Sequence, residues 1–297
     1  MMDAWTGEIR GEEIGNCTII EGDVRDKLGE LPASIFQCCV TSPPYWGLRD
    51  YKAHGQIGAE DDVDSYVQGL VGVFREVRRV LRDDGTLWLN IGDSYTSGNR
   101  TWRDDDKKNA GRGMSYRPPT PVGLKPKDLV GIPWRVAFAL QEDGWYLRAD
   151  IIWNKPNCQP ESVKDRPTRS HEYVFLMSKS ERYFYDVDAV KVPSNGSAQG
   201  KNRRSVWSAN GEETVWDLNT EPYKGAHFAV FPRGLVRPCL LAGSSPGSLV
   251  LDPFFGSGTT GEVCVELGRR CVGIELKREY IALAKERLAR SNVGLGI

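Results

Sequence analysis

The sequence predicts an α/β fold built on a doubly wound, mostly parallel sheet. Short apolar runs rich in β-branched residues alternate with segments in which apolar residues recur at a helical period. Near the C-terminus, residues 252–261 read Asp-Pro-Phe-Phe-Gly-Ser-Gly-Thr-Thr-Gly, a glycine-rich turn between a predicted strand and a predicted helix. With 297 residues, 40% of them hydrophobic and 27% charged, the chain can form one large domain that carries insertions.

Each expected element follows from a local pattern. Strands are expected where short apolar runs end in polar or glycine-containing turns, at residues 17–20, 35–40, 86–91, 146–153, 173–177, 248–251 and 270–274. Helices are expected where apolar residues repeat every three to four positions or where a segment connects two strands, at residues 24–31, 64–81, 129–141, 235–242, 258–267 and 280–290. Seven strands alternating with helices therefore predict a seven-stranded, Rossmann-like sheet.

Two polar segments interrupt this alternation. Residues 94–127 are rich in glycine and proline and predict a long mobile loop, and residues 183–225 predict an insertion. Both carry local positive charge: residues 100–127 contain eight basic and three acidic residues, and residues 191–210 contain four basic residues and no acid. Since the formal net charge of the chain is −1, contact with nucleic acid would have to come from such local patches. A solvated charged loop is the alternative for each patch.

The cysteines and the N-terminus indicate the compartment. Seven cysteines, an odd number without a C-x-x-C pair, predict reduced core thiols and no metal site. The N-terminal segment is polar and mixed in charge, and no apolar run approaches the length of a membrane span. The pattern is typical of a cytoplasmic protein without membrane partners.

The glycine-rich turn satisfies G-x-G-x-x-G, and Glu275 follows Gly256 by 19 residues. Taken alone, this is the fingerprint of a dinucleotide site, in which glycines let the backbone approach a ligand at a helix N-terminus and an acid binds ribose hydroxyls. A nicotinamide-dependent dehydrogenase is therefore an alternative, whereas the absence of a lysine after the glycines excludes a P-loop. Because 22 residues follow Glu275, the remaining strands of the cofactor half are expected from upstream, beginning with residues 17–20.

A second motif precedes the glycine loop by some 200 positions and reads Thr-Ser-Pro-Pro-Tyr-Trp at residues 41–46. Together the two motifs resemble the catalytic loop and the S-adenosylmethionine loop of enzymes that methylate an exocyclic amino group of a DNA base. Their order resembles the β class of these amino-methyltransferases, which are bacterial or phage DNA modification enzymes with a circularly permuted sheet. The resemblance covers roughly residues 19–290.

The resemblance assigns the transfer chemistry to the first motif. An exocyclic amine is a poor nucleophile because its lone pair is delocalised into the ring, and acceptors on its N–H groups can draw the nitrogen toward tetrahedral geometry. The Ser42 side chain and the Pro43 carbonyl would be these acceptors, Pro43 and Pro44 would make the loop rigid, and Tyr45 would stack on a base flipped out of the duplex.

The resemblance also implies a set of cofactor residues. Asp252 would receive the methionyl ammonium, Glu275 the ribose hydroxyls and Asp23 the adenine amino group. The His-Phe-Ala-Val-Phe-Pro segment at 227–232 would close over the methionyl end. The remaining loop and closing positions are Pro253, Phe254, Gly256, Ser257, Gly258, Thr259, Thr260, His227 and Phe228. Each of these assignments has a purely structural alternative. Asp252 would cap a helix, Glu275 would be a solvated strand end, Asp23 would stand in a turn and His227 would simply pack.

Three further segments resemble family features without an assigned role, at residues 87–95, 155–157 and 170–173. Asp93 is either a pocket residue or a cap, and His171 is expected to pack or to cap. DNA recognition is expected from residues 183–225, with contacts from Arg203, Arg204 and Trp207, and from the loop carrying Arg112.

The domain organisation expected from this resemblance is a tail at 1–15, a catalytic half at 16–182, a target-recognition insertion at 183–225 and a cofactor half at 226–297. The serine form of the catalytic loop favours cytosine N4 as the target, with adenine N6 as the alternative. A non-catalytic DNA-binding protein on the same scaffold is the competing hypothesis from another class. Expected partners are double-stranded DNA, a second copy of the chain and a cognate restriction endonuclease.

Overall fold

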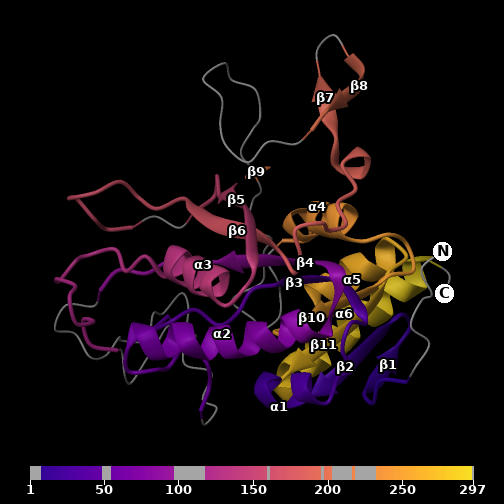
Figure 1. Ribbon diagram of the computed structural model, residues 1–297, viewed down its shortest axis with the longest axis horizontal. Helices are drawn as coiled ribbons and strands as arrows, with labels where there is room; N and C mark the ends of the chain where they lie inside the picture. Colours follow the sequence, from indigo (N-terminus) through magenta and orange to yellow (C-terminus); the bar gives the residue numbers. More distant parts are fainter. Residues whose placement is uncertain are drawn as a thin grey trace.

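The computed structural model describes residues 8–48, 55–96, 118–158, 161–194, 197–202, 216–217 and 232–295. Within these residues one large sheet is covered by helices on both faces (Figure 1). Its strands are β1 (Glu12–Ile14), β2 (Cys17–Glu21), β3 (Phe36–Thr41), β4 (Leu81–Ile91), β5 (Tyr146–Asn154), β6 (His171–Ser178), β9 (Trp216–Asp217), β10 (Leu249–Asp252) and β11 (Arg270–Glu275). The helices are α1 (Val24–Gly29), α2 (Val63–Val80), α3 (Ile132–Glu142), α4 (Arg233–Gly243), α5 (Thr259–Glu266) and α6 (Arg278–Leu295).

The strand order in the large sheet is β1-β2-β11-β10-β3-β4-β6-β5-β9. The central run from β2 to β4 is parallel, whereas β6 runs antiparallel to both β4 and β5. The strand expected from upstream is in the predicted place, because β2 pairs in parallel with β11 along its whole length. The α/β fold class with a mostly parallel sheet is therefore confirmed, and the circular permutation stays a prediction.

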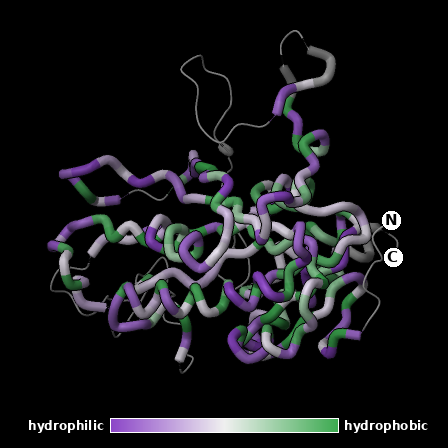
Figure 2. Tube along the Cα trace, in the orientation of Figure 1, coloured by the Kyte–Doolittle hydropathy of each residue, from purple (hydrophilic) through white to green (hydrophobic). Residues whose placement is uncertain are grey.

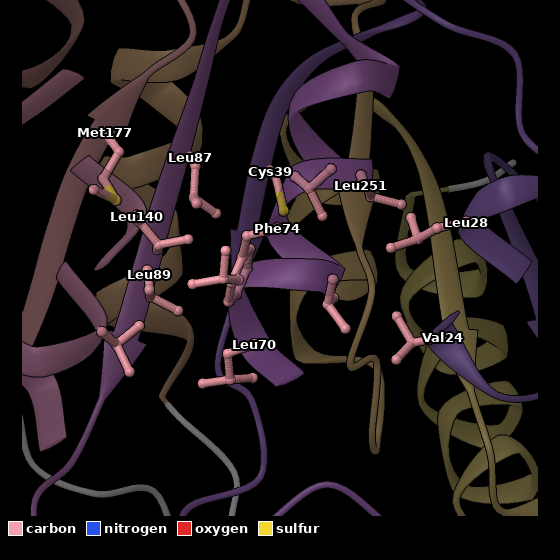
Figure 3. Packing of buried hydrophobic residues seen from close by; sticks show 14 of the residues in the cluster. Val24, Leu28, Cys39, Leu70, Phe74, Leu87, Leu89, Leu140, Met177 and Leu251 are labelled. Atoms are coloured by element: carbon pink, nitrogen blue, oxygen red, sulfur yellow. The ribbon is translucent and has the colours of Figure 1, made fainter. Parts of the chain in front are cut away.

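Alternate side chains of the parallel strands face two separate helical layers. Cys39 of β3 belongs to the core cluster formed with α1, α2 and α3, while its neighbour Cys38 belongs to the cluster formed with α4, α5 and α6. Figure 3 shows the first layer, in which Leu70 and Phe74 of α2 lie beside Leu89 of β4. Six of the seven cysteines are buried, and all seven are free thiols.

The structure adds strands that the sequence pattern did not predict. The expected tail contains β1, which pairs antiparallel with β2 through a tight turn. The expected insertion contains β9 at the far edge of the sheet and a separate hairpin of β7 (Val192–Ser194) and β8 (Ser197–Lys201). This hairpin projects away from the main sheet (Figure 1). Such short strands depend on a pairing partner and leave little periodicity of their own.

Two boundaries differ from the expected ones for local reasons. The helix expected at 129–141 begins at Ile132, because Gly131 adopts a left-handed conformation and Leu129 forms a β-bridge with Tyr95. The strand expected at 86–91 extends back to Leu81 and includes an irregularity in its pairing with β3.

The connection between β5 and β6 extends outward from the sheet (Figure 1) and is largely hydrophilic (Figure 2). Across the described ranges, no helix combines the length and the apolar character needed to cross a membrane.

Candidate active site

The two motifs meet at the carboxyl edge of the sheet. β3, which leads into the Ser-Pro-Pro loop, is the parallel neighbour of β10, which leads into the glycine loop. From this pair the chain turns in opposite directions, since β3 continues through α2 to β4 and β10 continues through α5 to β11. Such a reversal leaves a crevice outside the strand ends, where open α/β sheets bind their ligands.

Asp252 links the two loops through its carboxylate. Oδ1 accepts hydrogen bonds from Thr41 Oγ1 at 2.7 Å and from the Phe254 N–H at 3.1 Å, and Oδ2 accepts one from Thr260 Oγ1 at 2.6 Å. The residue is fully buried, and this burial raises its pKa to about 6. Asp252 therefore fixes the strand end before Ser42 to the first turn of α5.

Backbone conformation shapes the glycine loop. Gly256 and Gly258 have φ angles of 53° and 80°, in the left-handed region that favours glycine. The Gly256 N–H donates to Glu275 Oε2 at 2.8 Å, and the Lys277 N–H donates to Oε1 at 2.8 Å. Burial raises the pKa of Glu275. The carboxylate expected to bind ribose thus already holds the loop at the end of β11.

The phenyl ring of Phe255 fills the space behind this loop. A β-carbon on Gly273 would lie 2.2 Å from Phe255 Cγ, and one on Gly261 would lie 2.7 Å from Phe255 Cζ. Of the two residues before the ring, Pro253 is buried, and Phe254 packs edge-on against Phe74 with ring centroids 6.5 Å apart. The loop is therefore preformed.

The remaining polar residues of the loop test whether a ligand such as S-adenosylmethionine fits. Thr260 donates to Asp252, and Thr259 Oγ1 accepts a hydrogen bond from Arg287. Ser257 Oγ is buried and has no hydrogen-bond partner among the described residues. A buried hydroxyl without a partner, next to glycines at a helix N-terminus, fits a polar ligand that would complete its bonding.

The catalytic loop is held by neighbouring side chains. Tyr66 of α2 is fully buried and donates to the Pro44 carbonyl at 2.8 Å. The Trp46 indole N–H donates to the Glu60 carbonyl at 2.9 Å. Pro43 is buried in the same loop. These contacts keep the loop in one position before any substrate arrives.

Ser42 and Tyr45 belong to one polar network. Ser42 Oγ donates to Tyr45 Oη at 3.3 Å, and Tyr45 Oη lies 2.8 Å from Glu172 Oε2 and 3.2 Å from Asn90 Oδ1. Asn90 Nδ2 also donates to Glu172 Oε2 at 3.2 Å. Burial and the nearby Glu172 carboxylate raise the pKa of Tyr45 well above its usual value. Tyr45 is therefore a neutral hydroxyl whose ring is anchored in place.

The network continues to a partly buried ion pair. Lys155 Nζ contacts Glu172 Oε1, and the same ammonium lies 4.2 Å from the centroid of the Trp153 ring. The two charged side chains are only 19% and 17% exposed. Sequence reasoning noted the segments carrying Lys155 and Glu172 but gave them no role. Thr41 and Asn90 likewise stand in segments that the sequence pattern singled out, at 41–46 and 87–95, without a role of their own.

Asp23 lies beside the cofactor loop, at the end of β2. The adjacent Gly22 N–H donates to the Glu275 carbonyl at 3.0 Å, so the ends of β2 and β11 are neighbours. The Asp23 carboxylate caps α1 through the Arg25 N–H at 2.9 Å and pairs with the Arg25 guanidinium. That contact lowers the pKa of Asp23. Its expected contact with adenine stays a proposal.

The structure distinguishes the two expectations for Asp93. Its Oδ1 accepts from the N–H groups of Gly131 at 2.9 Å and Ile132 at 3.0 Å, at the start of α3. Asp93 therefore acts as a cap. His171 packs edge-on against Tyr173 with ring centroids 5.5 Å apart, and burial lowers its pKa.

The DNA-contact residues Arg112, Arg203, Arg204 and Trp207, together with His227 and Phe228 of the closing segment, lie outside the described residues.

Comparison with known proteins identifies the family. Residues 36–286 match the family model described as DNA methylase. The chain is 66% identical over 286 residues to the Type II methyltransferase M.SmaI of Serratia marcescens, covering 96% of this chain and 95% of that protein. It is 58% identical over 276 residues to M.Cfr9I of Citrobacter freundii, covering 93% and 89% of the two chains.

Solved structures share the fold. The PvuII DNA methyltransferase, described as cytosine-N4-specific, superimposes with a TM-score of 0.66 at 20% identity over 93% of this chain and 91% of that one. A Thermus thermophilus protein solved in complex with S-adenosyl-L-methionine gives a TM-score of 0.62 at 25% identity over 92% and 93% of the two chains. The chain therefore belongs to the DNA methylase family, the S-adenosylmethionine-dependent enzymes that methylate exocyclic amino groups of DNA bases.

Proposed function

We propose that this DNA methyltransferase modifies the N4 amino group of cytosine within a specific double-stranded site. One observation carries the proposal: a Ser-Pro-Pro-Tyr loop lies at the switch point of the sheet and is joined to the glycine loop through Asp252. The acceptor loop and the cofactor loop therefore open on the same crevice, as transfer between two bound molecules requires.

The catalytic loop would activate the amine. Ser42 Oγ and the Pro43 carbonyl would accept hydrogen bonds from its two N–H groups and stabilise the positive charge that develops on nitrogen. The hydrogen bond from Tyr66 to the Pro44 carbonyl holds the backbone of this loop, so the two acceptors are positioned before substrate binds. Tyr45 would present its anchored ring to the flipped base.

The glycine loop would hold the methyl donor. S-adenosylmethionine supplies an electrophilic methyl group when bound. Ser257 Oγ, which is buried without a partner among the described residues, and the first-turn N–H groups of α5 would be donors to the cofactor. Glu275 would bind the ribose, and Asp23 would bind adenine at the neighbouring strand end. The role of Asp252 toward the methionyl ammonium is proposed as well, although its observed contacts are with Thr41, Thr260 and a backbone N–H.

Two observations support cytosine over adenine. The loop begins with serine, the form more often associated with N4 methylation in this family. The PvuII enzyme, described as cytosine-N4-specific, has the same fold over 93% of this chain.

Mass spectrometry of nucleosides tests the target base. DNA of mixed sequence is incubated with the protein and S-adenosylmethionine and then digested. We expect N4-methylcytosine, and Ser42→Ala run beside the wild type should form it about 100-fold to 1000-fold more slowly. N6-methyladenine as the product would overturn the choice of base, and no methylated base in any DNA would overturn the function.

DNA recognition is proposed for residues 183–225. If Arg203 and Arg204 contact phosphates, replacing both with alanine should reduce the slope of log affinity against log salt by about 2. The double variant Arg278→Ala/Arg290→Ala is a matched control, since both arginines are exposed on α6. An unchanged slope in Arg203→Ala/Arg204→Ala would move the DNA-binding face elsewhere. A second copy of the chain, a cognate endonuclease and a cytoplasmic location stay predictions.

A further inference from the structure

The Lys155–Glu172 pair has no role in the function described so far, yet it touches the catalytic loop. Glu172 stands at the start of β6, 127 positions after Tyr45, and the two meet because β6 pairs with β4. The contact is short, at 2.8 Å between Tyr45 Oη and Glu172 Oε2, and Asn90 of β4 donates to the same carboxylate oxygen. A carboxylate is thereby held behind the loop that receives the amine.

The hydrogen bonds in this network have a direction. Ser42 Oγ donates to Tyr45 Oη at 3.3 Å, and Tyr45 Oη can in turn donate to Glu172 Oε2. With its own proton donated to Tyr45, Ser42 Oγ is left as an acceptor toward the substrate. Glu172 therefore sets the direction of the hydrogen bonds that run from Ser42 through Tyr45, because an ionised carboxylate can only accept hydrogen bonds.

Methylation of an amine also releases a proton. Once the nitrogen has gained a methyl group, it carries a positive charge that cannot delocalise while its N–H bonds remain. This cation is a much stronger acid than a carboxylic acid, so a nearby carboxylate is a sufficient final acceptor.

We propose that Glu172 is a positioning residue that orients Ser42 through Tyr45 and receives the proton displaced by methyl transfer. This inference rests on the proposed role of Ser42. The amine lone pair forms the new bond to the methyl carbon, while the carbon–sulfur bond breaks and its electron pair stays on sulfur. In the same step an N–H proton passes to Ser42 Oγ, the Ser42 proton to Tyr45 Oη, and the Tyr45 proton to Glu172 Oε2.

The surroundings of Glu172 suit this task. Lys155 contacts the other carboxylate oxygen, so Oε2 stays directed at Tyr45 while Oε1 is held by the ammonium. The Glu172 side chain is 17% exposed, which leaves a route for the proton to solvent. Tyr45 is held neutral by burial, so it relays a proton without being ionised itself.

Single-turnover kinetics test the proposal. Glu172→Gln should lower the rate of methyl transfer about 100-fold, the lower end of the range for loss of a general acid or base, while affinities for S-adenosylmethionine and DNA change less than twofold. Tyr45→Phe removes the relay hydroxyl and keeps the ring, and it should give a similar loss. The double variant Tyr45→Phe/Glu172→Gln should be no slower than the slower single variant, because both substitutions interrupt the same proton relay.

Two further readouts separate proton transfer from support of the fold. The wild type should show a solvent deuterium isotope effect on the single-turnover rate that Glu172→Gln lacks, and added formate should restore part of the rate of Glu172→Ala. Glu76→Gln is the matched control, since Glu76 pairs with Arg79 on α2, away from the site. It should leave rate and isotope effect unchanged.

The possible failures are distinguishable. If the wild type methylates DNA and Glu172→Gln is as fast, or if the losses from Tyr45→Phe and Glu172→Gln are additive, the relay is wrong and the proposed function stands. If Glu172→Gln fails to fold, Tyr45→Phe and its isotope effect still decide. If the wild type methylates no base, the proposed function itself has failed.

Discussion

The loops after β3 and β10 lie side by side, yet they are held by different means. Side-chain hydrogen bonds position the catalytic loop, from Ser42 through Tyr45 to Glu172. The glycine loop is positioned by left-handed glycines and by backbone N–H groups bonded to Glu275. Substitutions in the first loop should therefore change the rate of chemistry with the fold intact, and substitutions in the second should change stability and cofactor affinity together.

The largest expected effect comes from Ser42. Ser42→Ala removes one acceptor aimed at the amine, and the loss of one preorganised hydrogen bond to a developing charge costs about 100-fold to 1000-fold in rate. Affinity for S-adenosylmethionine should stay within twofold, because the glycine loop is untouched. Single-turnover methylation and calorimetric titration measure the two quantities.

A matched control for this variant is Ser291→Ala on α6, whose hydroxyl bonds the Arg287 carbonyl. It should retain the full rate. A wild-type rate in Ser42→Ala, or a loss confined to cofactor affinity, would remove the contrast between the two loops.

Asp252 contacts both the catalytic loop and the glycine loop, so its substitution tests how the two loops are held together. Its folded-state pKa of about 6 lies above the ordinary 3.8, so between these values the folded protein binds more protons than the unfolded chain. The free energy of unfolding contributed by Asp252 therefore falls as pH rises through this window and is level above it. Asp252→Asn removes this dependence.

Urea unfolding at pH 4.5 and pH 7.5 measures the effect. The wild type should lose about 2 kcal/mol relative to Asp252→Asn between the two pH values. Asp62→Asn is the control, because hydrogen bonds from Ser65 lower the pKa of that exposed cap and place its titration below this window. A constant difference between the wild type and Asp252→Asn would show that the buried carboxylate is not proton-linked to folding. Weaker S-adenosylmethionine binding by Asp252→Asn would support its proposed part in the cofactor site.

The sequence predicted the parts of this site that depend on local pattern. Alternation of apolar runs located β3 and β10, and the two motifs at their ends located the crevice. The pairing of β6 with β4 was not predictable, because a period of two does not specify a partner. The contact between Tyr45 and Glu172 depends on that pairing, so the role of Glu172 became visible only in three dimensions.

For Asp23 the sequence predicted the location in the fold but not the side-chain contact. Its place at the end of β2, next to β11, follows from the chain order expected for the cofactor half. Its ion pair with Arg25 depends on side-chain geometry in the first turn of α1, which neither strand nor helix period encodes.

The smallest expected effect concerns Gly258 in the glycine loop, and Gly247 is its matched control. Gly258 and Gly247 have nearly equal φ angles, 80° and 79°, but a β-carbon on Gly258 would lie 3.0 Å from the Ala284 Cβ, whereas one on Gly247 would have no atom within 4 Å. Both alanine variants should lose about 1–2 kcal/mol of unfolding free energy from the left-handed backbone, with Gly258→Ala at the upper end. Only Gly258→Ala should also bind S-adenosylmethionine several-fold more weakly, because only Gly258 begins α5 at the crevice. Equal cofactor affinity in the two variants would mean that the backbone of this loop does not approach the ligand. The division between a side-chain loop and a backbone loop would then have to be abandoned.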